Sequence, residues 1–107
     1  MSTTNTLKLD GPLTIRTIAD TKDVLSSFME QKGGSGKTLT IDIGDDTECD
    51  LTLAQLLLSA RKTAADGGMK IKLRGAAGAS LLAVLERAGI LTGDKKQDSF
   101  WLEGKAA

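Results

Sequence analysis

The sequence predicts a single α/β domain with a mixed sheet of four to five strands, parallel at its centre and flanked by three to four helices. Two kinds of segment follow one another along the chain. In one, apolar and polar residues alternate, as is typical of strands; in the other, apolar residues recur at helical spacing. This order implies right-handed crossovers between parallel strands, and 107 residues suffice for one core but not two. We expect one domain over residues 1–107, with flexible ends at residues 1–5 and 103–107.

The N-terminal part of the chain predicts two short strands and a helix. Residues 7–9 and 13–15 alternate in polarity on either side of Gly11-Pro12, a pair typical of a tight turn. From residue 17 to about residue 31 the apolar residues recur at mostly helical spacing, and Gly33-Gly34 ends the pattern.

The remainder predicts two further strand–helix units and a last strand. TLTIDI (38–43) and MKIKLRG (69–75) alternate in polarity and indicate strands. Apolar residues over 53–64 line one helical face until Gly67-Gly68, and a second stripe over 81–88 ends at Gly89. Phe100, Trp101 and Leu102 predict a short terminal strand.

The composition argues against several classes of function. No histidine is present, which removes Ser-His and Cys-His nucleophiles and most zinc sites, so we expect no enzyme and no cofactor. With 14 acidic and 14 basic residues and three aromatics, we expect no nucleic-acid binding. The one cysteine, the lack of an apolar leader at the N-terminus and the short apolar runs predict a cytoplasmic protein that does not insert into membranes.

GGSGKT (33–38) resembles the end of a phosphate-binding loop. That loop needs a glycine five residues before the Gly-Lys pair, where this chain has Gln31, and it joins a strand to a helix. Here the segment joins a predicted helix to a predicted strand, so we interpret it as a connector with a solvated Lys37.

Charged residues gather in two places. Asp42, Asp45, Asp46, Glu48 and Asp50 are five acids in nine residues at the carboxyl end of a predicted strand. They could hold Mg²⁺ or a phosphoryl group as in a response-regulator receiver, or form a solvated loop that sets the sign of a partner surface. Lys70, Lys72 and Arg74 could be a basic docking strip or only the outward side of a strand.

Residues 39–64, LTIDIGDDTECDLTLAQLLLSARKTA, resemble the central segment of STAS domains, the fold of bacterial anti-sigma-factor antagonists. In that family a strand ending in an Asp-Leu-Ser-like tripeptide leads through a loop to a hydrophobic-Asp-Ser/Thr-Ser/Ala-Gly-Leu motif at the start of a leucine-rich helix. Asp42-Ile43-Gly44 is similar to the strand end, Asp50 to the motif aspartate and residues 55–58 to the helix. The resemblance extends from about residue 7 to residue 102.

One departure from the family pattern concerns its regulatory hydroxyl. The phosphorylated serine or threonine follows the motif aspartate, where this chain has Leu51 and then Thr52. Either the switch is lost, which we favour, or phosphorylation has moved to Thr52. Thr52 with Gln55 also fits a helix capping box, and Asp50 fits a cap or turn. An exposed Leu51 would favour constitutive binding.

The resemblance implies a non-catalytic interaction module in bacterial signalling. Its partner would be an anti-sigma factor that is a serine kinase, or a chemotaxis kinase; alternatively, the chain is the STAS subunit of a phospholipid-transport ABC complex and binds its ATPase. The sequence leaves the oligomeric state open. The implied partner-binding residues are Gly44, Asp45, Asp46, Thr47, Glu48, Asp50, Leu51, Thr52 and Gln55.

Overall fold

The computed structural model describes residues 6–9, 12–34, 36–44, 47–75, 77–91, 93 and 95–102, with the backbone alone at 95–97. The expected flexible ends lie outside these residues. Along the chain the elements are β1 (Thr6–Leu9), α1 (Ile18–Lys32), β2 (Thr38–Ile43), α2 (Leu51–Asp66), β3 (Lys70–Leu73), α3 (Ala79–Arg87) and α4 (Lys95–Leu102). The predicted α/β class and the alternation of strands and helices are confirmed.

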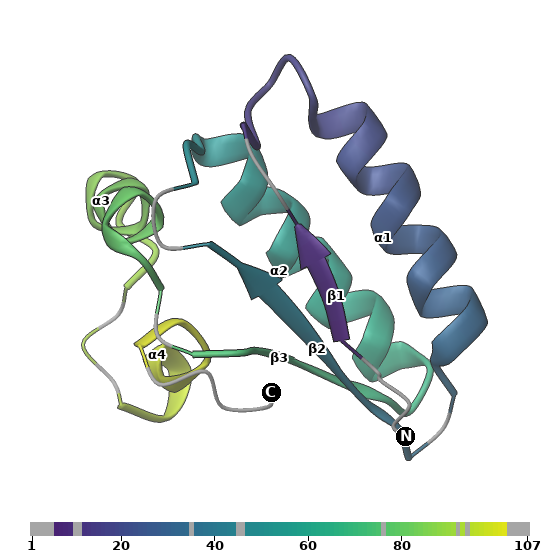
Figure 1. Cartoon of the computed structure of the whole chain (residues 1–107). Helices are drawn as coiled ribbons and strands as arrows, with labels where there is room; N and C mark the ends of the chain where they lie inside the picture. The colour runs from purple at the N-terminus through teal and green to yellow at the C-terminus, as the bar shows by residue number, and fades with distance from the viewer. Residues whose placement is uncertain are drawn as a thin grey trace.

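The strands form a parallel sheet in the order β1-β2-β3, so β2 lies at its centre (Figure 1). Each strand alternates in burial, because successive side chains point to opposite faces. Leu39 and Ile41 of β2 are fully buried, whereas Thr38 beside them is exposed. Among the described elements, the helices gather on one face of the sheet and around its borders (Figure 1). The alternation places polar residues on the other face, for example Thr40, Asp42 and Lys72.

The helices are held to the sheet by one continuous apolar core. α1 packs against β1 and α2, α2 packs against β3 and α3, and α4 packs against β3 (Figure 1). The core contains Leu25 of α1, Leu57 of α2 and Leu85 of α3, all within the stripes that the sequence predicts. Gly68 and Gly89 follow α2 and α3 with φ of 76° and 69°, a conformation that costs glycine little, which is why both helices end there.

The predicted sheet of four to five strands was wrong for the described residues, which contain three strands, all parallel. Residues 13–15 form no strand: Leu13 makes an isolated parallel bridge with Cys49, and the chain then turns through Thr14–Thr17. Leu13 is buried but Ile15 is exposed, so the apolar spacing that predicted a strand does not reflect a buried face.

The predicted terminal strand at residues 100–102 was also wrong, since these residues end helix α4. Phe100 and Trp101 are adjacent in sequence and both are buried, at 1% and 2% exposure. A strand would send adjacent side chains to opposite faces, whereas a helix can place both in one core. Their rings meet edge to face with centroids 4.9 Å apart, and the carbonyl of Trp101 accepts a hydrogen bond from the Ala77 amide at 2.7 Å.

Among the described helices, none has the length and apolar character needed to cross a bilayer.

A candidate docking surface at the start of α2

Asp50 joins two segments of the chain at the N-terminus of α2. Its Oδ1 accepts hydrogen bonds from the amide of Thr52, at 3.0 Å, and from the Thr52 hydroxyl. Its Oδ2 accepts a hydrogen bond from the amide of Ile15, at 2.9 Å. The carboxylate therefore caps α2 and also fixes the turn between β1 and α1 beside it.

Backbone contacts hold the same two segments together. The amide of Leu13 donates to the carbonyl of Glu48 at 2.7 Å, next to the bridge between Leu13 and Cys49. Because Leu13 is buried in the core, this contact anchors the turn that presents Ile15. The position of Ile15 thus depends on both the core and the Asp50 carboxylate.

Two large apolar side chains lie exposed next to Asp50. Leu51, the first residue of α2, is 43% exposed, and Ile15 is 70% exposed. We call Ile15 and Leu51 the apolar pair. Exposed apolar side chains that flank a fixed polar group are suited to the desolvated centre of a protein interface. The sequence interpretation missed Ile15 because it treated residues 13–15 as a strand.

The other described residues predicted for partner binding lie between the end of β2 and the second turn of α2. Gly44 and Glu48 are exposed, Thr47 is half-buried, and the Thr47 amide donates to the Gly44 carbonyl at 3.1 Å in a turn. Gln55 is exposed one turn into α2. Asp45 and Asp46 lie outside the described residues.

The helix cap differs from the capping box predicted for Thr52 and Gln55. Asp50 is the N-cap residue and Thr52 lies inside the first turn of α2, where its half-buried hydroxyl donates to Asp50. This hydrogen bond lowers the pKa of Asp50 below its ordinary value of 3.8, with smaller help from the amides of Ile15 and Thr52. The alternative interpretation of the sequence, in which Asp50 caps the helix, is confirmed.

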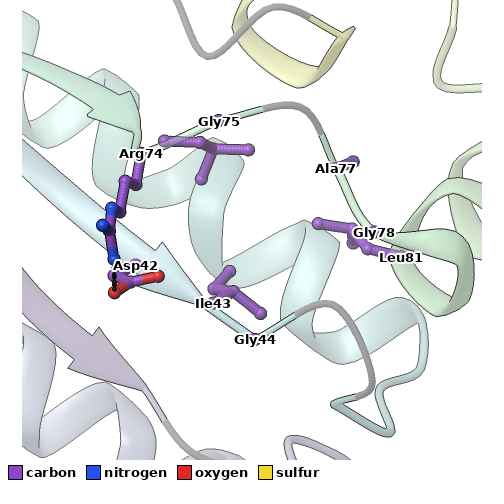
Figure 2. Close-up of a pocket in the computed structure, with 9 residues that line it drawn as sticks. Asp42, Ile43, Gly44, Arg74, Gly75, Ala77, Gly78 and Leu81 are labelled. Carbon is purple, nitrogen blue, oxygen red and sulfur yellow. Dashed lines mark hydrogen bonds and ion pairs between the residues drawn. The ribbon is translucent and has the colours of Figure 1, made fainter.

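The described acids of this segment do not form one shared site. Asp42 lies at the end of β2 and forms an ion pair with Arg74, 3.0 Å between Nη1 and Oδ2 (Figure 2). Asp50 is engaged at the cap, and the described residues contain no cluster of three or more potential metal ligands.

A hollow of about 340 Å³ lies between the ends of β2 and β3 and the start of α3, beside the Asp42–Arg74 pair (Figure 2). Apolar side chains and glycines form much of its lining. The exposed Arg74 side chain is already paired with Asp42, so it offers no unpaired charge to the hollow.

Cys49 is half-buried beside Asp50. Burial raises the pKa of its thiol above the ordinary value of 9.0, and the negative charge of Asp50 raises it further. Since the thiolate is the nucleophile, Cys49 is poorly suited to nucleophilic chemistry at neutral pH.

The segment that resembles a phosphate-binding loop joins α1 to β2. Lys37 in it is exposed, as the sequence predicts for a connector. The order is helix to strand, so no helix begins where a bound phosphate would need one.

A comparison with protein-family models agrees with this architecture. A family model described as "Mlab, STAS domain" matches residues 2–92. The protein therefore belongs to the STAS domain family, whose members generally mediate protein–protein interactions. No curated protein and no solved structure matches the chain.

Proposed function

We propose that this protein is a non-catalytic docking module in bacterial signalling. It would bind an anti-sigma factor or another kinase, for instance a chemotaxis kinase, through the turn around Ile15 and the start of α2. The observation that carries the proposal is the apolar pair, held on either side of the Asp50 carboxylate and exposed at 70% and 43%.

The groups at this surface support binding rather than chemistry. The Asp50 carboxylate accepts three hydrogen bonds, and the Thr52 hydroxyl donates one of them. The neighbouring thiol of Cys49 has a raised pKa. These groups are suited to fixing the shape of the surface, while the apolar pair provides the area that a partner can bury.

The surface also favours a permanent interaction over a phosphorylation switch. Leu51 occupies the position of the family's usual phosphoacceptor and has no hydroxyl. A phosphate on Thr52 would lie against the Asp50 carboxylate, and this repulsion opposes modification there. We therefore infer that docking is not regulated by phosphorylation at residues 51 and 52.

A second candidate function is the STAS subunit of a phospholipid-transport ABC complex that binds its ATPase. The exposed Leu51 favours this alternative as well, because a subunit that stays bound needs an apolar contact and no phosphoacceptor. The two candidates share the surface and differ in the partner.

The test is the variant Leu51→Glu, with Val24→Glu as the matched control. Both residues are exposed and apolar, but Val24 lies on α1 and is not one of the apolar pair. Glutamate is tolerated in the first turn of a helix, so the fold should persist. We expect Leu51→Glu to weaken partner binding by about 2 kcal/mol, roughly 30-fold, as for a residue at the centre of an interface.

The measurement is quantitative mass spectrometry of proteins that co-purify with each variant from the native cells. A kinase that is lost only with Leu51→Glu supports the first candidate, and an ABC ATPase lost in the same way supports the second. If Leu51→Glu retains the same proteins in the same amounts as the unmodified chain, the proposed docking surface is wrong.

A further inference from the structure

The outward side of α2 carries residues in a spacing that suits helix–helix packing. Leu51, Gln55, Leu58, Lys62 and Ala65 follow one another at intervals of four, three, four and three residues. Such spacing brings side chains into a line along one face of a helix, as in the seam of a coiled coil. We call these five residues the α2 seam.

The α2 seam is exposed along its whole length. Leu58 is 38% exposed and, like Leu51, is among the few large apolar side chains that the described surface presents. Gln55, Lys62 and Ala65 are also exposed. From the first to the last seam residue α2 rises by about 21 Å, enough for four turns of a partner helix.

Shallow hollows flank both ends of the α2 seam. The first, about 290 Å³, lies between Leu51 and the residues Val84, Arg87 and Ala88 around the end of α3. The second, about 380 Å³, lies beside Leu58 and is lined by Arg61, Lys62 and Ala65. Apolar side chains of a helix lying along the seam could enter these hollows.

The charged residues that line the two hollows are mostly positive, and the exposed Asp66 adds one acid at the end of α2, four residues after Lys62. Arg61, Lys62 and Arg87 line the two hollows, and the one acid among the lining residues, Asp50, is already engaged at the helix cap. The guanidinium of Arg61 is half-buried over the ring of Phe100, 4.3 Å from its centroid, and no carboxylate among the described residues forms an ion pair with it. A partly desolvated cation in this position would gain from an acidic group supplied by a partner.

We propose that the α2 seam binds an amphipathic helix of the partner protein, with apolar residues every three or four positions and acidic residues on its flanks. This inference rests on the proposed docking function and adds the chemistry of the bound segment. The apolar side of the helix covers Leu51 and Leu58, and its carboxylates face Arg61, Lys62 and Arg87. Positive flanks reject a helix with basic flanks, so they contribute to partner selection.

The experiment is photocrosslinking in the native cells with p-benzoyl-phenylalanine in place of one residue at a time. The three positions are Leu58 in the seam, Leu51 in both the seam and the apolar pair, and Val24 on α1 as the control. All three are exposed, so the fold should accept the larger side chain, and thermal unfolding checks this. Mass spectrometry identifies the partner segment attached at each position.

We expect crosslinks from Leu51 and Leu58 to one acidic segment with apolar residues at helical spacing, and none from Val24. Crosslinks from Leu51 without Leu58 overturn the seam and leave the proposed function standing. Crosslinks from neither leucine overturn both. A segment that lacks acidic residues or helical apolar spacing, or equal crosslinking from Val24, also overturns the proposal.

A charge reversal tests the acidic flanks separately. Lys62→Glu should reduce the Leu58 crosslink by about tenfold, because it places like charges across the interface. Lys22→Glu, the same change at an exposed position on α1, should leave it unchanged. Replacing the facing acid of the identified segment by lysine should restore the crosslink in the Lys62→Glu variant. If Lys62→Glu does not weaken the crosslink, or if the acid-to-lysine exchange does not restore it, the charge assignment is wrong.

Discussion

At the scale of single residues, Asp50 links stability to the candidate site. It caps α2, binds the Thr52 hydroxyl and holds the amide of Ile15. The same side chain therefore sets where the helix begins and where the apolar pair is placed. A change at Asp50 should affect the fold and the docking surface together.

The ionised form of Asp50 should stabilise the fold in a pH-dependent way. Its pKa is lowered from 3.8 in the folded chain, so its contribution is present above that pH and disappears as the pH falls through the folded value. Asp50→Asn keeps an acceptor oxygen but has no charge to lose.

We expect Asp50→Asn to lower the free energy of unfolding by roughly 1 kcal/mol at pH 7, with a gap that closes below pH 4. Urea unfolding at several pH values measures this gap. A gap that stays constant down to pH 3 would show that the charge of Asp50 contributes nothing.

Sequence reasoning at this scale found Asp50 and Leu51 but not Ile15. The resemblance to the STAS motif singled out Asp50 and Leu51, and Asp50 also fits a helix cap. Ile15 is exposed because Leu13 is bound to the segment of Glu48, a contact between positions 35 residues apart. No local pattern contains that information.

At the scale of secondary-structure elements, α4 behaves as part of the core although it lies at the end of the described chain. Phe100 and Trp101 belong to the same apolar cluster as Leu39 and Leu57, and Ala77 is bound to the end of α4 through its backbone. The guanidinium of Arg61 covers the Phe100 ring, so α4 also contacts α2.

Alanine substitutions in α4 should distinguish its buried side chains from its exposed ones by their effect on stability. Trp101→Ala should lower the free energy of unfolding by about 3–5 kcal/mol, because it leaves a large cavity in the core. Leu102→Ala, one residue further at an exposed position, should change it by less than about 0.5 kcal/mol. Denaturation followed by circular dichroism measures both, and equal losses would place Leu102 in the core and contradict the helix.

At the scale of the whole molecule, one core joins the sheet and all the described helices. It runs from Leu9 in β1 through β2 and α2 to Trp101 in α4. The sheet is covered on one side only by the described residues, and its other side carries polar side chains in parallel register across the strands. The docking surface and the α2 seam both lie at α2, which leaves that polar side clear of the proposed interface.

A single core predicts a single unfolding transition. Trp101 is the one tryptophan of the chain and lies in α4, so its fluorescence reports on that element, whereas circular dichroism reports on all helices and strands. We expect the two signals to give coincident denaturation curves. A fluorescence transition at lower denaturant would mean that α4 leaves the core before the rest unfolds.

The sequence by itself determined the order of the main elements, the faces that they bury and the family. The order and the buried faces follow from periodicity, because an amphipathic segment buries its apolar side best in one regular conformation. The family follows instead from the motif resemblance over residues 39–64. The tertiary structure decided the state of the short segments at 13–15 and 100–102, and the exposure of Ile15, Leu51 and Leu58. Three residues are compatible with a strand, a turn or the end of a helix, and the choice depends on contacts with distant parts of the chain, here Glu48 and Ala77.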